Sequence, residues 1–82
     1  MDLKVYRNIK KIRELKNFTR EYVAAELAMS TSGYGKIERG EVDITVTKLI
    51  RLAAILEVSV SFILNFDING IFEETKKFEN KQ

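Results

Sequence analysis

Apolar residues recur three and four positions apart along most of the 82-residue chain, and no proline interrupts them. This spacing places apolar side chains on one face of a helix, whereas a half-buried strand would show strict alternation. Val5, Ile9, Ile12 and Leu15 form the first such series and predict a helix over residues 4–16. The pattern therefore predicts an all-α fold, in a chain long enough for one small domain.

Four further helices follow from the same spacing and from residues that favour helix ends. A hydroxyl side chain can accept a hydrogen bond from a free backbone N–H in the first turn, so Thr19, Ser30 and Ser59 are predicted helix caps. The helix after Ser30 should end at Gly40, and another should run over residues 45–56. The residues of these helices expected to be buried are Val23, Ala24, Leu27, Val46, Leu49, Ile50, Ala53, Leu56, Val60, Phe62, Ile63 and Leu64.

Positive charge is concentrated at the N-terminal end of the chain. Residues 1–20 contain seven Lys and Arg against two Asp and Glu, although the net charge of the whole chain is only +2. A local excess of this kind favours an anionic partner. A basic helix face that is simply solvated would give the same pattern, so charge alone leaves both interpretations open.

Composition excludes several classes of function. The chain has no cysteine and no histidine, so it lacks disulfides, thiolate metal ligands and the commonest general base. We expect no metal site, no cofactor, no small-molecule ligand domain and no enzyme activity. The longest apolar run, residues 52–56, is far shorter than the roughly 20 residues of a membrane span. Residues 1–11 lack the apolar run of a signal peptide, and we expect a cytoplasmic protein.

The segment STSGYGKIERGE, residues 30–41, contains two glycines within helix-compatible sequence. Two helices joined by a short turn, the second one capped, form a helix-turn-helix pattern. At about 100° per residue, Gly35 falls on the outer face of the second helix, while Gly33 falls on the inner face beside the alanines of the first. Gly35 is then either a gap left for close approach of a partner or a tolerated surface glycine. The outer face also carries Thr31, Ser32, Lys36 and Arg39, and the inner face carries Tyr34, Ile37 and Glu38.

Residues 9–66 resemble the lambda-repressor/Cro-type helix-turn-helix family, also called the XRE family. The resemblance is carried by IKKIRELKNFTREYVAAELAMSTSGYGKIERGE and ITVTKLIRLAAILEVSVSFIL. It implies a five-helix lambda-repressor-like DNA-binding domain over residues 1–66 and a C-terminal tail over residues 67–82, with an extra helical turn or short helix. The implied function is a sequence-specific double-stranded DNA-binding transcriptional regulator, which binds a palindromic operator as a homodimer through its third helix.

The same resemblance implies roles for individual residues. Thr31, Ser32 and Lys36 stand at positions that reach base edges in the major groove. Gly35 would be the close-approach glycine between them. Arg13 and Glu38 resemble a structural ion pair that links the first and third helices, and a carboxylate on an inner helix face needs such a partner.

The resemblance also implies phosphate contacts by Thr19, Arg20, Ser30 and Arg39. One departure from the family is the loop Glu41-Val42-Asp43, which carries acidic residues where many relatives carry basic ones. Carboxylates close to phosphates repel them. The loop therefore lies away from the DNA, weakens the affinity, or indicates that DNA is not the main ligand.

A dimer or partner surface is expected on the last predicted helix and the tail, although the tail could instead fold back over the small core. The alternative function is an antitoxin or protein-interaction module with the same fold, whose tail binds a toxin or another protein. The residues predicted for this surface are Val60, Ile63, Leu64, Phe66, Ile71, Phe72 and Phe78.

Overall fold

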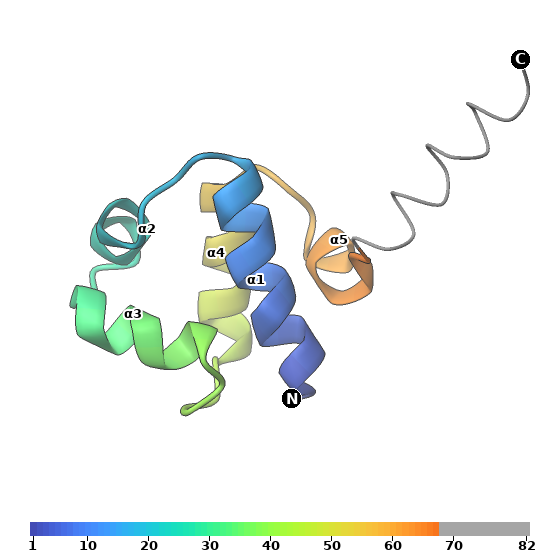
Figure 1. Cartoon of the computed structure of the whole chain (residues 1–82), viewed down its shortest axis with the longest axis horizontal. Helices are drawn as coiled ribbons and strands as arrows, with labels where there is room; N and C mark the ends of the chain where they lie inside the picture. The colour runs from blue at the N-terminus through green and yellow to red at the C-terminus, as the bar shows by residue number, and fades with distance from the viewer. Residues whose placement is uncertain (68–82) are drawn as a thin grey trace, which may run out of the picture.

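The computed structural model describes residues 1–67 and contains five α-helices in that part of the chain. In Figure 1, α1 passes in front of α4 through the middle of the molecule, with α2 and α3 on one side and α5 on the other. The all-α prediction is confirmed for these residues. The weak helix predicted near the C-terminus lies outside them. The helices are α1 (Leu3–Leu15), α2 (Arg20–Glu26), α3 (Thr31–Glu38), α4 (Val46–Leu56) and α5 (Val60–Asn65).

Every one of these helices begins after a side chain that accepts a hydrogen bond from a backbone N–H of the first turn. Thr19, Ser30, Thr45 and Ser59 do so over 3.0 or 3.1 Å, and Asp2 does so for α1. Each cap satisfies one of the N–H groups that a helix start leaves without a partner, which contributes about 1 kcal/mol. The caps predicted at Thr19, Ser30 and Ser59 are confirmed.

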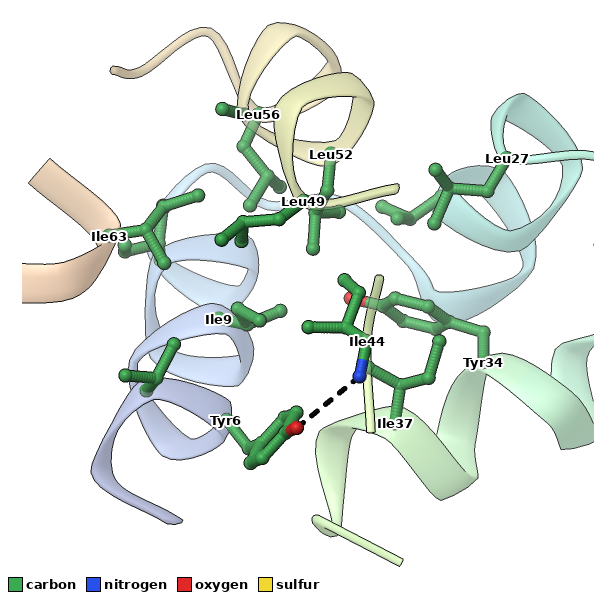
Figure 2. Packing of buried hydrophobic residues seen from close by; sticks show 14 of the residues in the cluster. Tyr6, Ile9, Leu27, Tyr34, Ile37, Ile44, Leu49, Leu52, Leu56 and Ile63 are labelled. Carbon is green, nitrogen blue, oxygen red and sulfur yellow. Dashed lines mark hydrogen bonds between the residues drawn. The ribbon is translucent and has the colours of Figure 1, made fainter. Parts of the chain in front are cut away.

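The apolar core lies where the inner faces of the helices meet. Figure 2 shows Ile9 of α1 and Ile63 of α5 on one side of it, with Tyr34 and Ile37 of α3 opposite. These four side chains are each at most 2% exposed. Burying an aliphatic side chain of this size contributes about 1.5–3 kcal/mol, so the position of α3 depends on this packing.

The core differs from the prediction at several positions. Phe62 and Leu64 of α5 were expected to be buried but are 44% and 42% exposed. Val46 and Ile50 of α4 are 69% and 56% exposed, and Leu15 of α1 is 59% exposed, whereas Leu52 is fully buried. The predicted α4 series was too wide for one helix face, and the side chains of Val46 and Ile50 fall on the solvent side. Leu15 is the last residue of α1, where the chain turns away toward α2.

Two polar side chains of α1 make hydrogen bonds that attach distant elements to this helix. The hydroxyl of Tyr6 accepts a bond from the Ile44 N–H (3.3 Å; Figure 2) and donates one to Asp43 Oδ1 (3.2 Å). Asn8 Nδ2 donates to the Ile63 carbonyl over 2.8 Å. The first set fixes the loop between α3 and α4, and the second fixes α5.

An ion pair joins α1 to α3 at the two residues for which the family resemblance implied one. Arg13 donates from Nε to Glu38 Oε2 (2.6 Å) and from Nη2 to Glu38 Oε1 (3.2 Å), and both side chains are buried. Arg13 Nη1 also donates to the Phe18 carbonyl over 2.7 Å. Arg20, at the start of α2, adds a third contact from Nε to Glu38 Oε1 at 3.4 Å. Glu38 therefore holds α1, α2 and α3 together.

The protonation states of Glu38, Arg13 and Tyr34 follow from their burial and from the contacts between them. Burial on its own would raise the pKa of Glu38, but the hydrogen bonds and positive charge of Arg13 outweigh burial and leave the pKa below its ordinary value. The hydrogen bond to Glu38 raises the pKa of Arg13. Burial raises the pKa of Tyr34, and the neighbouring carboxylate of Glu38 raises it further. At neutral pH, Glu38 and Arg13 are therefore charged and Tyr34 is neutral.

The turn between α2 and α3 contains an alanine in a backbone conformation that favours glycine. Ala28 has φ of 55°, in the left-handed region. Gly40, after α3, has φ of 72°, and a Cβ there would lie 2.5 Å from Leu3 Cδ2. An L-residue in this region costs about 1–2 kcal/mol. Gly40 therefore has both a conformational and a packing reason to be glycine, whereas Ala28 carries strain.

Ala28→Gly should raise the free energy of unfolding by about 0.5–1 kcal/mol, because glycine removes the strain of the positive φ. Ala25→Gly is the matched control, since Ala25 is exposed inside α2. There the same substitution should lower the free energy by about 1 kcal/mol. Urea denaturation measures both. A loss of stability in Ala28→Gly would contradict the assigned strain.

Glu38→Gln should lower the free energy of unfolding by about 3 kcal/mol at pH 7, because it leaves the buried Arg13 charge without its partner. The folded-state pKa of Glu38 is lowered, so its contribution is present above the ordinary value of 4.5 and is lost as pH falls below it. The difference between wild type and variant should therefore shrink in acid. Glu14→Gln, on the exposed face of α1, should change little at any pH.

Candidate nucleic-acid interface

The helices α2 and α3 are joined by a tight turn. Figure 1 shows α2 end-on and α3 along its length, so that the two axes cross. Ser30 closes the turn by accepting the Gly33 N–H at its Oγ over 3.0 Å. A hydroxyl that accepts one hydrogen bond still has its own hydrogen to donate. The exposed hydroxyls of Ser30 and Thr19 therefore cap their helices and can still donate to an anion.

The α3 helix has one buried and one exposed side. Tyr34, Ile37 and Glu38 are between 0% and 5% exposed, and Figure 2 shows Tyr34 and Ile37 within the packed core. On the other side lies a strip of small polar and basic side chains, called the α3 strip below. The α3 strip consists of the exposed residues Thr31, Ser32, Lys36 and Arg39.

Gly35 does not form an open gap in the α3 strip. It is buried, and a Cβ at this position would lie 3.1 Å from Nη1 and 3.9 Å from Cζ of Arg39. The expectation that Gly35 is an open surface for close approach was wrong, because a helix wheel places Cβ positions and does not show where a long side chain folds. The Arg39 guanidinium occupies the place beside Gly35.

Gly33 also has neighbours other than those expected. It is only half-buried, and a Cβ there would lie 3.0 Å from Ser30 Oγ and 3.6 Å from Met29 Cε. The expected close approach to the alanines of α2 was therefore wrong. Gly33 instead leaves room for the hydroxyl that caps α3.

Arg20 and Arg39 are half-exposed arginines that already have carboxylate partners. The Arg20 side chain is 48% exposed and contacts Glu38, and the Arg39 side chain is 59% exposed and bonds through Nε to Glu41. Asp43 accepts from the Tyr6 hydroxyl and lies 3.9 Å from the N-terminal amine. Both acidic residues of the loop after α3 therefore have partners within the chain.

An open groove of about 380 Å³ lies between α1 and the end of α3. Arg7, Lys10 and Lys11 of α1 line it, together with Arg39, which directly follows α3. The sequence showed the excess of positive charge in residues 1–20 but did not indicate a groove. Positions 7, 10 and 11 lie on one face of a helix. This spacing was the feature of the sequence from which a basic surface on α1 could have been predicted.

The surface predicted for self-association is only partly exposed. Ile63 is fully buried and Phe66 is 5% exposed, so both belong to the core and their assignment to an outer surface was wrong. Val60 is half-buried, and Leu64 is 42% exposed. The other predicted residues, Ile71, Phe72 and Phe78, lie outside the described part of the chain.

Within residues 1–67 the structure contains no group of three or more His, Cys, Asp or Glu side chains placed to hold a metal ion. In the same part of the chain, no helix has the length and apolar character needed to cross a bilayer.

Comparison with known proteins identifies this arrangement. Residues 9–63 match the model of the helix-turn-helix family. The chain is also similar to the SPbeta prophage-derived uncharacterized HTH-type transcriptional regulator YonR of Bacillus subtilis (strain 168), with 32% identity over 71 residues. That match covers 80% of this chain and 66% of the relative, so the chain spans just under two thirds of the relative's length. The chain belongs to the helix-turn-helix family, of the XRE type.

Proposed function

We propose that the chain is a cytoplasmic, sequence-specific double-stranded DNA-binding transcriptional regulator whose α3 enters the major groove. The main observation behind this proposal is that α3 has one buried side and one side exposed to solvent. Tyr34, Ile37 and Glu38 hold its inner side while the α3 strip faces solvent. The major groove admits one α-helix and displays a distinct set of donors and acceptors for each base pair. The family and the name of the similar regulator support the same function.

Base readout is assigned to three exposed residues of α3. Thr31 and Ser32 stand in its first turn, and Lys36 stands about one turn further on. A lysine ammonium can donate to O6 and N7 of guanine, and the threonine methyl can contact the methyl group of thymine. These side chains supply donors at the place where the helix end would lie deepest in the groove.

Phosphate contacts are assigned to Thr19, Arg20 and Ser30, which lie around the starts of α2 and α3. The bond between Arg20 and Glu38 holds the Arg20 guanidinium beside α3 while leaving about half of the side chain exposed. A guanidinium fixed in advance loses less conformational freedom when it binds a phosphate. Contacts of this kind position the protein without reading the sequence.

A homodimer on a palindromic operator is the form that we propose for tight binding. A single module of this size buries only about 600–1,000 Å² on DNA, and two modules with one dyad would place their recognition helices about 34 Å apart. Val60 and Leu64 of α5 are assigned to the dimer surface, continued by the tail residues Ile71, Phe72 and Phe78.

Selection of binding sites from a random duplex pool tests the regulator proposal. The protein should enrich a palindrome, and Lys36→Ala should weaken the preference at one position per half-site by about 1–3 kcal/mol. A pool with no enriched motif, together with a protein partner that co-purifies with the chain, would favour the protein-interaction alternative.

Arg20→Ala should weaken binding to all sequences about equally and reduce the slope of log K against log salt by about 1, because it removes one phosphate contact. Glu38 keeps Arg13, so the fold should persist, as circular dichroism can verify. Arg51→Ala is the charge-matched control, because Arg51 lies on α4 and bonds the Glu26 carbonyl. An equal effect of both variants on the salt slope would exclude the specific phosphate contact.

Leu64→Asp should shift the protein from dimer to monomer in sedimentation and weaken operator binding at least tenfold, because a carboxylate is costly to bury in an interface. Val46→Asp is the control, since Val46 is the more exposed apolar residue, at 69%, and lies on α4. Dimers that survive Leu64→Asp and dissociate in Val46→Asp would place the interface on α4.

A further inference from the structure

The geometry points to Arg39 as a specificity-determining residue rather than a phosphate contact. We propose that its guanidinium, which lies over Gly35 and is oriented by Glu41, donates to O6 and N7 of a guanine in the major groove. This inference rests on the proposed DNA-binding function and adds a base-reading residue to it. It also gives roles to Gly35 and Glu41.

The position of the Arg39 side chain follows from helix geometry. Side chains of helical residues lean toward the N-terminus, so a residue covers the surface about one turn before its own Cα. Arg39 follows α3 and leans back over Gly35, whose missing side chain makes the space. A Cβ at residue 35 would lie 3.1 Å from Arg39 Nη1, which is closer than an ordinary van der Waals contact. A Cβ at residue 35 would therefore require this guanidinium to shift from its present position.

The folded-back side chain lies within the α3 strip. At about 100° per residue, Arg39 falls roughly 80° around the helix from Thr31, between Thr31 and Lys36. Its Nη1 lies beside residue 35, which is about one helical turn before Arg39 in the direction of the start of α3. The start of α3 is the end assigned to base readout. The guanidinium is thus placed toward base edges and away from the helix end, where the flanking backbone would pass.

Glu41 favours a base over a phosphate as the target of Arg39. The carboxylate bonds Nε of Arg39, so the two terminal nitrogens remain available as a fork. The carboxylate of Glu41 is half-exposed and would repel a phosphate bound by Arg39. The carboxylate of Glu38 beside Arg20, in contrast, is buried and already paired with Arg13. The O6 and N7 acceptors of guanine carry no net charge. Such a pair gives a directional donor with little nonspecific attraction for DNA. An acidic loop that is unfavourable for phosphate binding is therefore consistent with base readout.

The experiment compares binding sites selected from a random duplex pool by wild type, Arg39→Lys and Gly35→Ala. Wild type should show a guanine at one position of each half-site. Arg39→Lys should reduce preference for that guanine by about 10- to 100-fold, because lysine lacks the fork. Gly35→Ala should reduce the same preference without lowering thermal stability, since alanine favours helix.

Two further variants separate the possible roles. Glu41→Gln should increase affinity for all sequences and steepen the salt dependence, while the preference for the guanine falls. Arg7→Lys is the matched control, since Arg7 lies on α1 beside the same groove, and it should leave every base preference unchanged.

The outcomes distinguish this inference from the function on which it rests. If wild type enriches a motif and Arg39→Lys weakens all sequences equally, Arg39 contacts phosphate and the inference is overturned while the regulator proposal stands. An unchanged guanine preference in both Arg39→Lys and Gly35→Ala also overturns it. If wild type enriches no motif, both proposals fail.

Discussion

The buried ion pair between Arg13 and Glu38 is the interaction on which the presentation of α3 depends. Apolar packing of Tyr34 and Ile37 holds α3 against the core but does not by itself fix its rotation. The paired bonds of 2.6 and 3.2 Å are directional, so they turn one side of the helix toward α1 and the opposite side toward solvent. The desolvation of both charges offsets much of their attraction. The ion pair therefore contributes more to the orientation of α3 than to the net free energy of folding.

Local features of the sequence were sufficient to predict much of the fold. A capping hydroxyl such as that of Ser30 bonds a backbone N–H only three residues away. The three-residue spacing of Ile9 and Ile12 indicates that both side chains lie on the same face of a helix. The resemblance to a family added the pairing of Arg13 with Glu38, which lie 25 residues apart and which no local rule connects. These predictions succeeded because each concerns either neighbours in sequence or a recurrent family contact.

Predictions failed where the outcome depended on which other element covers a residue. Ile50 and Ile63 are both apolar residues in helices. Ile63 is buried because α5 packs against the core, whereas Ile50 is exposed because no described element covers it. Gly35 fell on the outer face of the wheel as predicted, yet it is buried because Arg39 folds back over it. The direction of a long, flexible side chain cannot be obtained from Cβ positions. The candidate site was therefore less predictable than the fold.

The bond from Asn8 to the Ile63 carbonyl has a consequence for how far apart two recognition helices can stand. It ties α5 to α1, and the bonds of Arg13 to Glu38 tie α1 to α3, so a stiff path connects the proposed dimer surface to the reading helix. Each base pair inserted between half-sites adds about 3.4 Å and turns the second site by roughly 35°. A dimer formed through α5 would have to break or strain these bonds to absorb that turn. Operator spacing would then be a fixed property of the protein, set by its interior and not by the residues that touch DNA.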